Sequence, residues 1–288
     1  MNIFKSMKSR KIIKKIIFIP TVICLFLVLY AWQIERHWVE VVSMKMPIEY
    51  LPKHLEGKTL MQISDLHTGR WVSNDYLIST FEEMRKYDPD FVVYTGDYVT
   101  YKNKKVLYDK LEEALRHCVK GRLGTIAVLG NHDYGVNWRE PKVADSIVQL
   151  MRSHQIVVLR NERIQIEGLT FIGLDDLWAG EFNASKAFEN YDAAQANVVL
   201  SHNPDTCDLE VWQNYQGWIL SGHTHGGQCK PPFLTPPVLP VKNKEYASGK
   251  IELSNQRTLY VNRGIGHSIP VRFNVRPEIT IFELEKRK

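Results

Sequence analysis

Five short clusters of metal-binding residue types each stand directly after an apolar run of the chain. They are Asp65-Leu66-His67, Gly96-Asp97, Gly130-Asn131-His132-Asp133, Ser201-His202-Asn203 and Gly222-His223-Thr224-His225. Open α/β sheets bind their ligands at the carboxyl ends of the strands, where side chains from neighbouring strands converge. The chain is therefore expected to form an α/β fold that brings the five clusters to one point.

Hydrophobic periodicity predicts the helices and strands of this fold. Strands are expected at 58–63, 91–94, 124–129, 197–200, 217–220, 257–261 and 278–284, with a hairpin over 164–173 and helices over 75–87, 105–120 and 141–154. The second half has several strands for each helix, which favours two stacked mixed sheets with helices outside. Without repeats or low-complexity tracts, residues 55–288 are interpreted as one domain.

The segment 230–241 holds five prolines among apolar residues, so it is expected to be neither a helix nor a central strand. It is interpreted as an apolar surface loop.

Residues 16–32 are a run of 17 residues without a charge. This length is at the short end of the roughly 17 to 25 residues that cross a bilayer. A buried core helix is the alternative, but such a helix usually has a polar face. A cleaved signal peptide is disfavoured because residues 30–33 offer no small-x-small site. We expect a basic tail at 1–15, a transmembrane anchor at 16–32 and a connector at 33–54.

Charge predicts the orientation of this anchor. The tail carries six basic residues, against three in 33–53 (Arg36, Lys45 and Lys53). The positive-inside rule then leaves the N-terminus in the cytoplasm and the catalytic domain outside a cytoplasmic membrane that is crossed once. Beyond the tail, 31 basic and 32 acidic residues remain, so nucleic acid is not expected as a partner. No sequence pattern indicates an obligate protein partner.

The composition of the clusters indicates the kind of metal. Carboxylate, imidazole and amide oxygen together suit Mn, Fe or Zn, whereas Ca and Mg sites are mostly oxygen. In Asp-x-His and His-x-His, alternate residues of an extended chain point the same way and can reach one metal cluster. Taken singly, each cluster is more often a turn or a surface pair. Together, at five strand ends, they predict a transition-metal site.

The order of the five clusters resembles the calcineurin-like metallophosphoesterase superfamily over Asp65 to His225. The stretch from Arg263-Gly264-Ile265-Gly266 to Arg276-Pro277-Glu278 is similar to the bacterial branch that includes YkuE and YaeI, which is related to the chlamydial type of UDP-2,3-diacylglucosamine pyrophosphatase. This resemblance implies a four-layer αββα sandwich, in agreement with the elements above. It also implies a centre of two divalent metal ions, with Mn favoured over Fe or Zn.

The resemblance assigns the candidate ligands residue by residue. It implies that Asp65, His67 and His225 hold the first metal, that Asn131, His202 and His223 hold the second, and that Asp97 bridges them. Two such cations lower the pKa of a bridging water and neutralise phosphoryl oxygens, so that hydroxide can attack phosphorus.

Three further residues are candidates for roles in the reaction. His132 can protonate the leaving oxygen or stabilise the phosphoryl group, and Asp133 can orient its ring. The alternative for Asp133 is a turn residue that caps the next segment. Arg70 can pair with a substrate phosphate, although a solvated surface arginine fits the sequence equally well.

These inferences favour a hydrolase of phosphodiester or pyrophosphate bonds, acting on a lipid-linked or cell-envelope substrate. The alternative is a UDP-2,3-diacylglucosamine pyrophosphatase, but that substrate is made in the cytoplasm, whereas the charge count places this domain outside. A non-catalytic scaffold would be expected to have lost metal ligands or His132, and this chain retains them. A metallopeptidase is disfavoured because the chain has no His-Glu-x-x-His.

Overall fold

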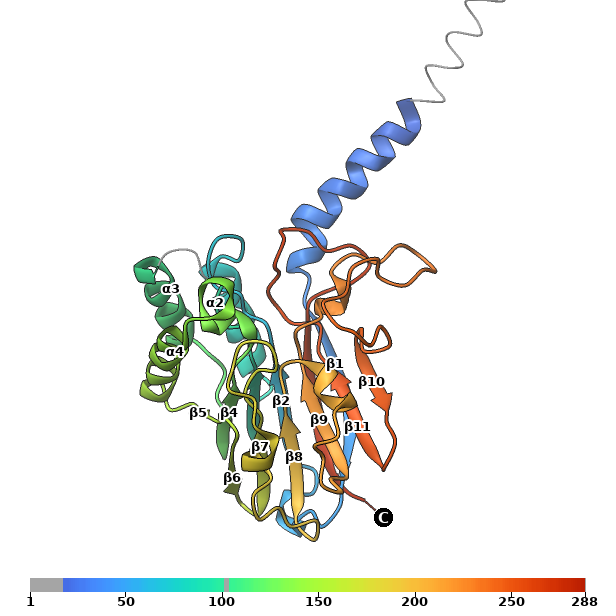
Figure 1. The fold of residues 1–288 in the computed structure, drawn as a ribbon. Coiled ribbons are helices and arrows are strands. Elements are labelled where there is room, and N and C mark those ends of the chain that lie inside the picture. The colour runs from blue at the N-terminus through green and yellow to red at the C-terminus, as the bar shows by residue number, and fades with distance from the viewer. Residues whose placement is uncertain (1–17, 101–103, 288) are drawn as a thin grey trace, which may run out of the picture.

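The computed structural model describes residues 18–100 and 104–287, which form a long N-terminal helix and an α/β body (Figure 1). The helix Phe18–His37 has a mean hydropathy of 1.8 and is long and apolar enough to cross a membrane. Only 11% of its most apolar window is buried, so it is not a core helix of the body. The predicted basic tail and the first two residues of the predicted anchor lie outside the described residues.

The first sheet has six strands in the order β1-β12-β2-β3-β4-β5. Their bounds are β1 Glu40–Ile48, β2 Thr59–Ile63, β3 Phe91–Thr95, β4 Gly124–Val128, β5 Val157–Val158 and β12 Glu278–Lys286. Strands β2 to β5 are parallel, while β12 runs antiparallel to β2 and parallel to β1. The crossovers between the parallel strands contain α2 (Asn74–Arg85), α3 (Lys104–Arg116) and α4 (Pro141–Ser153).

The second sheet also has six strands, in the order β10-β11-β9-β8-β7-β6. Their bounds are β6 Glu162–Ile166, β7 Leu169–Gly173, β8 Ala196–Leu200, β9 Gly217–Ser221, β10 Gly249–Glu252 and β11 Arg257–Val261. Strands β7, β8, β9 and β11 are parallel, and the two outer strands are antiparallel to their neighbours. The predicted fold class of two mixed sheets with helices is confirmed.

Three apolar layers hold the body together. The first lies between α2, α3 and α4 and the outer face of the first sheet. The second lies between the two sheets, where Phe91 packs on Phe171 and Trp218 on Phe282. The third covers the second sheet, where the only α-helix in the described residues is the short α5 (Ala184–Ala187). The fourth layer of the sandwich is therefore built mostly from irregular segments.

The segment 33–54, predicted as a connector, contains a strand of the first sheet. Strand β1 pairs with β12 from Glu40 to Ile48, and Met46 and Ile48 are buried in the layer between the sheets. The sequence prediction missed this strand because Lys45 and Pro47 interrupt its apolar pattern. An edge strand tolerates both residues, since one of its sides needs no hydrogen-bond partner. The short strands β5 and β10 were also missed.

Candidate metal centre

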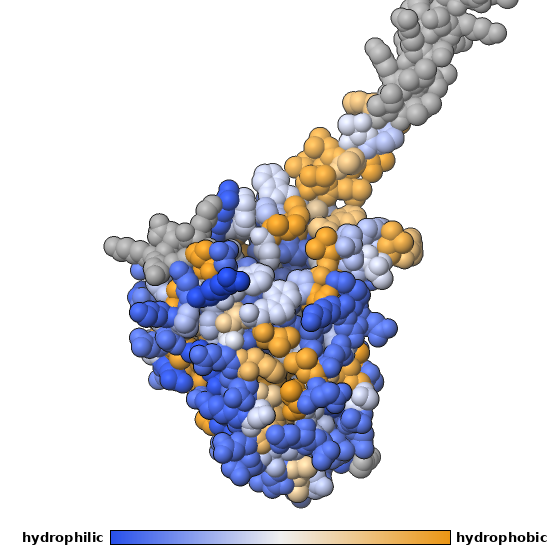
Figure 2. All heavy atoms as spheres, in the orientation of Figure 1, coloured by the Kyte–Doolittle hydropathy of each residue, from blue (hydrophilic) through white to orange (hydrophobic). Residues whose placement is uncertain are grey.

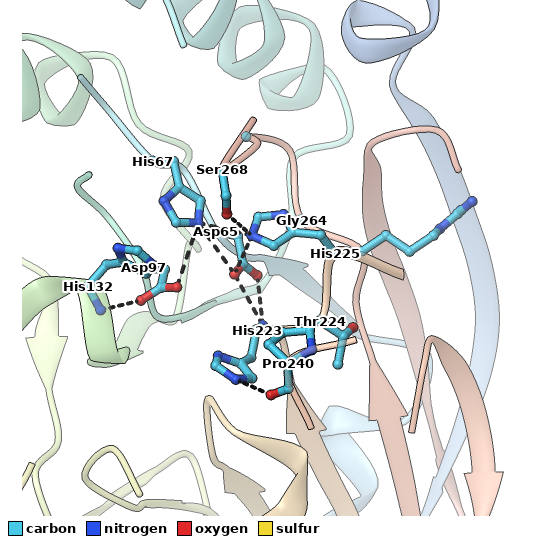
Figure 3. Close-up of polar contacts among 12 residues, drawn as sticks. Asp65, His67, Asp97, His132, His223, Thr224, His225, Pro240, Gly264 and Ser268 are labelled. Carbon is cyan, nitrogen blue, oxygen red and sulfur yellow. Dashed lines mark hydrogen bonds and ion pairs between the residues drawn. The ribbon is translucent and has the colours of Figure 1, made fainter. Parts of the chain in front are cut away.

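Strand ends from both sheets meet at one end of the body, and the candidate metal ligands lie there. Strands β2, β3 and β4 lead to Asp65 and His67, to Asp97 and to Asn131, while β8 and β9 of the second sheet lead to His202 and to His223 and His225. All seven side chains are buried, although the chain provides them from five separate strands. Figure 3 shows several of them pointing toward a common centre.

Asp65, His67 and His225 form the first group. The Nε2 atoms of His67 and His225 lie 3.0 Å apart, and Asp65 Oδ1 lies 3.4 Å from His225 Nε2 and 4.0 Å from His67 Nε2. Three potential donor atoms thus surround a space of the size that one ion needs.

Asp97, His202 and His223 form the second group. Asp97 Oδ2 lies 3.2 Å from His202 Nε2, which in turn lies 3.2 Å from His223 Nδ1. The same Asp97 oxygen is 3.6 Å from His67 Nε2 in the first group, so this carboxylate lies between the two groups. Six of the seven residues that the sequence analysis assigned to two neighbouring metals thus lie together, and the seventh, Asn131, lines the same cavity as Asp97 and His223.

Hydrogen bonds outside the cluster fix the histidine rings. His202 Nδ1 lies 2.7 Å from the Thr95 carbonyl and His223 Nε2 lies 2.8 Å from the Pro240 carbonyl. Because a carbonyl oxygen only accepts, each of these nitrogens must donate its proton. The other ring nitrogen then faces the cluster, which is the arrangement of histidines that bind metals. His67 is held similarly by Thr100 Oγ1 at 2.8 Å.

The site buries several ionisable side chains, and their pKa values are shifted by burial and by one another. Burial raises the pKa of the Asp65 carboxyl to about 7 and lowers that of the His67 and His223 rings to about 3. At Asp97 the effect of burial is outweighed by His202 and His132, which hold the pKa of that carboxyl well below its usual range. Asp97 in turn raises the pKa of His202 to about 10, against the effect of burial. A cation between Asp97 and His202 would take the place of that proton.

A metal pair fits the residues at this site. The Asn131 side-chain oxygen is buried and has no hydrogen-bond partner, an arrangement that costs free energy unless a cation or another donor satisfies it. The neutral imidazoles of His67, His223 and His225 converge with buried carboxylates, and buried charges are usually paired or bound to metals. The mixture of nitrogen and oxygen donors suits transition metals rather than Ca or Mg.

Glycines make room for the carboxylates of the cluster. A Cβ at Gly130 would collide with the Asp97 side chain, and a Cβ at Gly222 would collide with the side chains of Ser64 and Asp65. Among Gly96, Gly130 and Gly222, only Gly96 has a positive φ, of 99°, a backbone conformation that other residues rarely adopt. Of the three strand-end glycines, two are therefore required for close approach rather than for the turn.

The contacts of Asp133 favour the alternative role that the sequence offered for it, a residue that caps a turn. Its carboxylate accepts hydrogen bonds from the backbone N–H groups of Gly130 at 2.8 Å, Asp97 at 3.0 Å and Tyr98 at 2.8 Å. Within the described chain it makes no hydrogen bond to the ring of His132. Asp133 fixes the loop that carries Asp97, which is closer to the turn-capping alternative than to a catalytic role.

His132 lies at the edge of the cluster. Its ring is partly exposed, with its centroid 4.9 Å from that of His67, and its backbone N–H donates to Asp97 Oδ1 at 2.9 Å (Figure 3). Arg70 does not line the cavity of the cluster in the described chain, and its exposed guanidinium lies 4.2 Å from the centroid of the Trp71 ring. The geometry supports His132 as a candidate that faces substrate and gives no such support to Arg70.

The sequence analysis missed several residues of the site. Asp176 follows β7, is buried, and has one carboxylate oxygen without a hydrogen-bond partner; burial raises its pKa to about 6. A carboxylate after a predicted strand was the same signal that identified the other clusters, and it could have found Asp176. Trp178 lies against the ring of His223, with 4.5 Å between centroids, and stacks on Trp138. No local pattern predicted this pair of tryptophans.

Comparison with known proteins agrees with the site. Residues 58–227 match the calcineurin-like phosphoesterase family model. The chain is 31% identical to the UDP-2,3-diacylglucosamine pyrophosphatase LpxG of Chlamydia trachomatis, with 80% of this chain and 85% of that protein covered. It is 30% identical to the phosphodiesterase YaeI of Escherichia coli, with 88% and 92% covered.

A solved structure shows that the fold is shared. The dimetal phosphatase from Danio rerio matches with a TM-score of 0.51 at 15% identity, covering 75% of this chain and 90% of that one. The family match includes all five clusters of candidate ligands, from Asp65 to His225. The chain therefore belongs to the calcineurin-like phosphoesterase family and is a metal-dependent phosphoester hydrolase.

Proposed function

We propose that the protein hydrolyses a phosphodiester or pyrophosphate bond in a lipid-linked or cell-envelope substrate. The observation that carries this proposal is a cavity of about 370 Å³ that is lined by both polar and apolar side chains. The polar residues include Asp97, Asn131 and His132, and the apolar residues include Trp138, Trp178, Val238 and Ile269. A phosphate group bound at the polar residues thus has apolar side chains in the same cavity for an apolar substituent.

In this proposal the cluster holds two divalent transition-metal ions, with Mn as the favoured metal. Asp65, His67 and His225 hold one ion, Asn131, His202 and His223 hold the other, and Asp97 contacts both. When bound, the ions would neutralise phosphoryl oxygens and lower the pKa of a water molecule that attacks phosphorus. The carbonyls of Thr95 and Pro240 keep two of the ligating rings in the required tautomer.

His132 is the proposed general acid. Its ring lines the cavity and is partly exposed, so it can reach a substrate without leaving its place beside His67. As the new P–O bond forms and the old one breaks, the ring would give its proton to the leaving oxygen, a step that typically contributes about 10²- to 10⁴-fold. The backbone contact to Asp97 holds this residue beside the candidate ligands.

The N-terminal helix supports a location at a membrane. In the proposal it is a single-pass anchor of residues 16–32 with the N-terminus in the cytoplasm, and the catalytic domain lies outside. Because β1 pairs with β12, that domain comprises residues 55–288 together with Glu40–Ile48.

The second candidate is cleavage of the pyrophosphate bond of a nucleotide-linked acyl sugar. The name of the chlamydial relative describes such an activity for that protein. The stacked rings of Trp138 and Trp178, with centroids 5.3 Å apart, also offer an aromatic surface in the cavity that Asp97, Asn131 and His132 line. This candidate would require the catalytic domain to reach a nucleotide-linked substrate from the cytoplasmic side.

The test is hydrolysis of bis(p-nitrophenyl) phosphate and p-nitrophenyl phosphate by the purified full chain with added Mn. Asp97→Asn and His132→Ala are compared with His54→Ala, a matched control because His54 is exposed and precedes β2, far from its carboxyl end. We expect metal-dependent turnover of the bis-ester in the wild type and in the control, and its loss in the two site variants. Turnover that needs no metal, or that survives Asp97→Asn, would contradict the proposal.

A further inference from the structure

The loop 230–241 and the segment 265–275 lie at the end of the body from which the N-terminal helix leaves (Figure 1), and apolar residues are exposed at that end (Figure 2). Together the two segments carry four exposed large apolar side chains. Their exposed fractions are 104% for Phe233, 62% for Leu234, 71% for Val238 and 53% for Ile269. We call these four residues the docking surface. The body buries its other large apolar clusters in three layers, so this concentration calls for an explanation.

Phe233 is held in a strained backbone conformation at the tip of its loop. Its φ is 66°, and the N–H of Leu234 donates to the carbonyl of Pro231 at 3.2 Å, which places Phe233 third in a tight turn. That position with a positive φ favours glycine, and a bulky residue there costs stability. The fully exposed ring regains none of this cost by packing in the body. Strain that persists in this way is typical of residues with a function.

The base of the N-terminal helix is fastened to the neighbouring segment 265–275. The N–H of Arg272 donates to the Ala31 carbonyl at 3.0 Å, and the N–H of Val275 donates to a Glu35 carboxylate oxygen at 2.6 Å. Tyr30 of the helix and Pro232 of the loop line one depression. The helix and the docking surface are therefore parts of one connected structure, further stiffened by the five prolines of the loop.

The docking surface continues into the cavity of the candidate metal centre. Val238 and Ile269 line that cavity together with His132 and His223. The loop from 228 to 240 contains one basic residue, Lys230, and no acidic residue. It therefore has no negative charge that anionic lipid headgroups would repel. A layer of lipid against this surface would lie at the mouth of the cavity.

We propose that the docking surface is a second membrane contact and that its occupant is the lipid bilayer crossed by the N-terminal helix. Phe233 and Leu234 enter the headgroup region beside the helix, and the mouth of the cavity then faces the lipid. A lipid-linked phosphoester passes from this bilayer to the metal centre along Val238 and Ile269. The entry of lipid rests on the proposed hydrolysis, whereas contact with the bilayer rests only on the N-terminal helix as a membrane anchor.

Contact with the bilayer is tested with a spin label in the full chain, reconstituted into phosphatidylethanolamine and phosphatidylglycerol vesicles. The label is placed at Phe233→Cys in a Cys24→Ser, Cys229→Ser background, since Cys118 and Cys207 are buried. The control is Ser254→Cys in the exposed turn before β11, at the opposite end of the body. We expect the Phe233→Cys label to collide more with oxygen than with an aqueous nickel chelate, and the control label to show the reverse.

Equal access of nickel to both labels would overturn the proposal. Low access of both reagents to the Phe233→Cys label would also overturn it, because that result indicates contact with protein, such as a second copy of this chain. These readouts involve no catalysis, so they remain decisive even if the proposed function fails.

The route of the substrate is tested with two chromogenic phosphodiesters, dioleoylphosphatidyl-p-nitrophenol in vesicles and soluble bis(p-nitrophenyl) phosphate. The variant combines Phe233→Gly, which suits the positive φ, with Leu234→Ser. We expect turnover of the lipid ester to fall about 10-fold or more, with turnover of the soluble ester unchanged and unfolding in detergent no easier than for the wild type. Equal turnover of the lipid ester by variant and wild type would refute the route.

Discussion

Substitution of Asp133 distinguishes a structural from a catalytic role for this residue. The carboxylate accepts four hydrogen bonds from buried backbone N–H groups, three at 2.8 to 3.0 Å and one, from Val99, at 3.4 Å. Asp133→Ala leaves the three closest N–H groups without a partner, and each buried unsatisfied group costs about 1 to 3 kcal/mol. Relaxation of the loop reduces this cost, so we expect the free energy of unfolding to fall by about 3 to 6 kcal/mol. That is a large part of a typical stability of about 5 to 15 kcal/mol.

The assay is urea unfolding of the full chain in detergent, followed by tryptophan fluorescence, with a chelator present to remove the contribution of bound metal. Asp133→Asn keeps one acceptor oxygen and is expected to lose less, about 1 to 3 kcal/mol. His132→Ala serves as the neighbouring control and should shift stability by about 1 kcal/mol or less. An Asp133→Ala protein with wild-type stability and lost activity would refute this reasoning and restore the orienting role.

Three further predictions follow from the contacts of single residues. His132→Ala should lower kcat for the bis-ester about 10²- to 10⁴-fold with the metal content unchanged, as measured by turnover and elemental analysis of the same sample; lost metal would instead make His132 a ligand. Gly222→Ala should weaken metal binding at least about 10-fold in a titration with Mn, because its Cβ displaces Asp65; unchanged affinity would contradict the close approach. Asp90 is buried, but the N–H of Thr59 and the guanidinium of Arg122 hold the pKa of its carboxyl below the usual value. Its contribution to stability is therefore complete above about pH 4 and is lost at lower pH. Urea unfolding between pH 6 and pH 2, at roughly unit steps, should show a smaller loss for Asp90→Asn than for the wild type; parallel curves would contradict this.

The parts of the fold that local patterns encode were predictable from the sequence. Helix α4 begins at Pro141 and strand β4 at Gly124, as the periodicity and turn residues indicated. Strand β1 was not found, since its role depends on pairing with β12 at the far end of the chain. The pattern of a single segment carries no information on such a distant partner.

In the candidate site, too, local features were predictable from the sequence and contacts between distant segments were not. The clusters after β2, β3, β4, β8 and β9 were identified because ligand types at strand ends are visible in the sequence. The distance of 3.2 Å between Asp97 and His202, and the stacked rings of Trp138 and Trp178, depend on how the two sheets face each other. The two roles offered for Asp133 were not distinguished for a related reason. Its partners are backbone N–H groups, and sequence letters do not show where those groups point.

The most direct test of the account is the number of metal ions that each chain binds. The full chain, loaded with Mn and freed of excess metal by gel filtration, is measured by elemental analysis beside Asp97→Asn. The account predicts two ions per chain in the wild type, and about one or fewer in the variant, because Asp97 is the carboxylate between the two groups. A folded wild type that binds one ion or none, or a variant that still binds two, would contradict the two-metal centre.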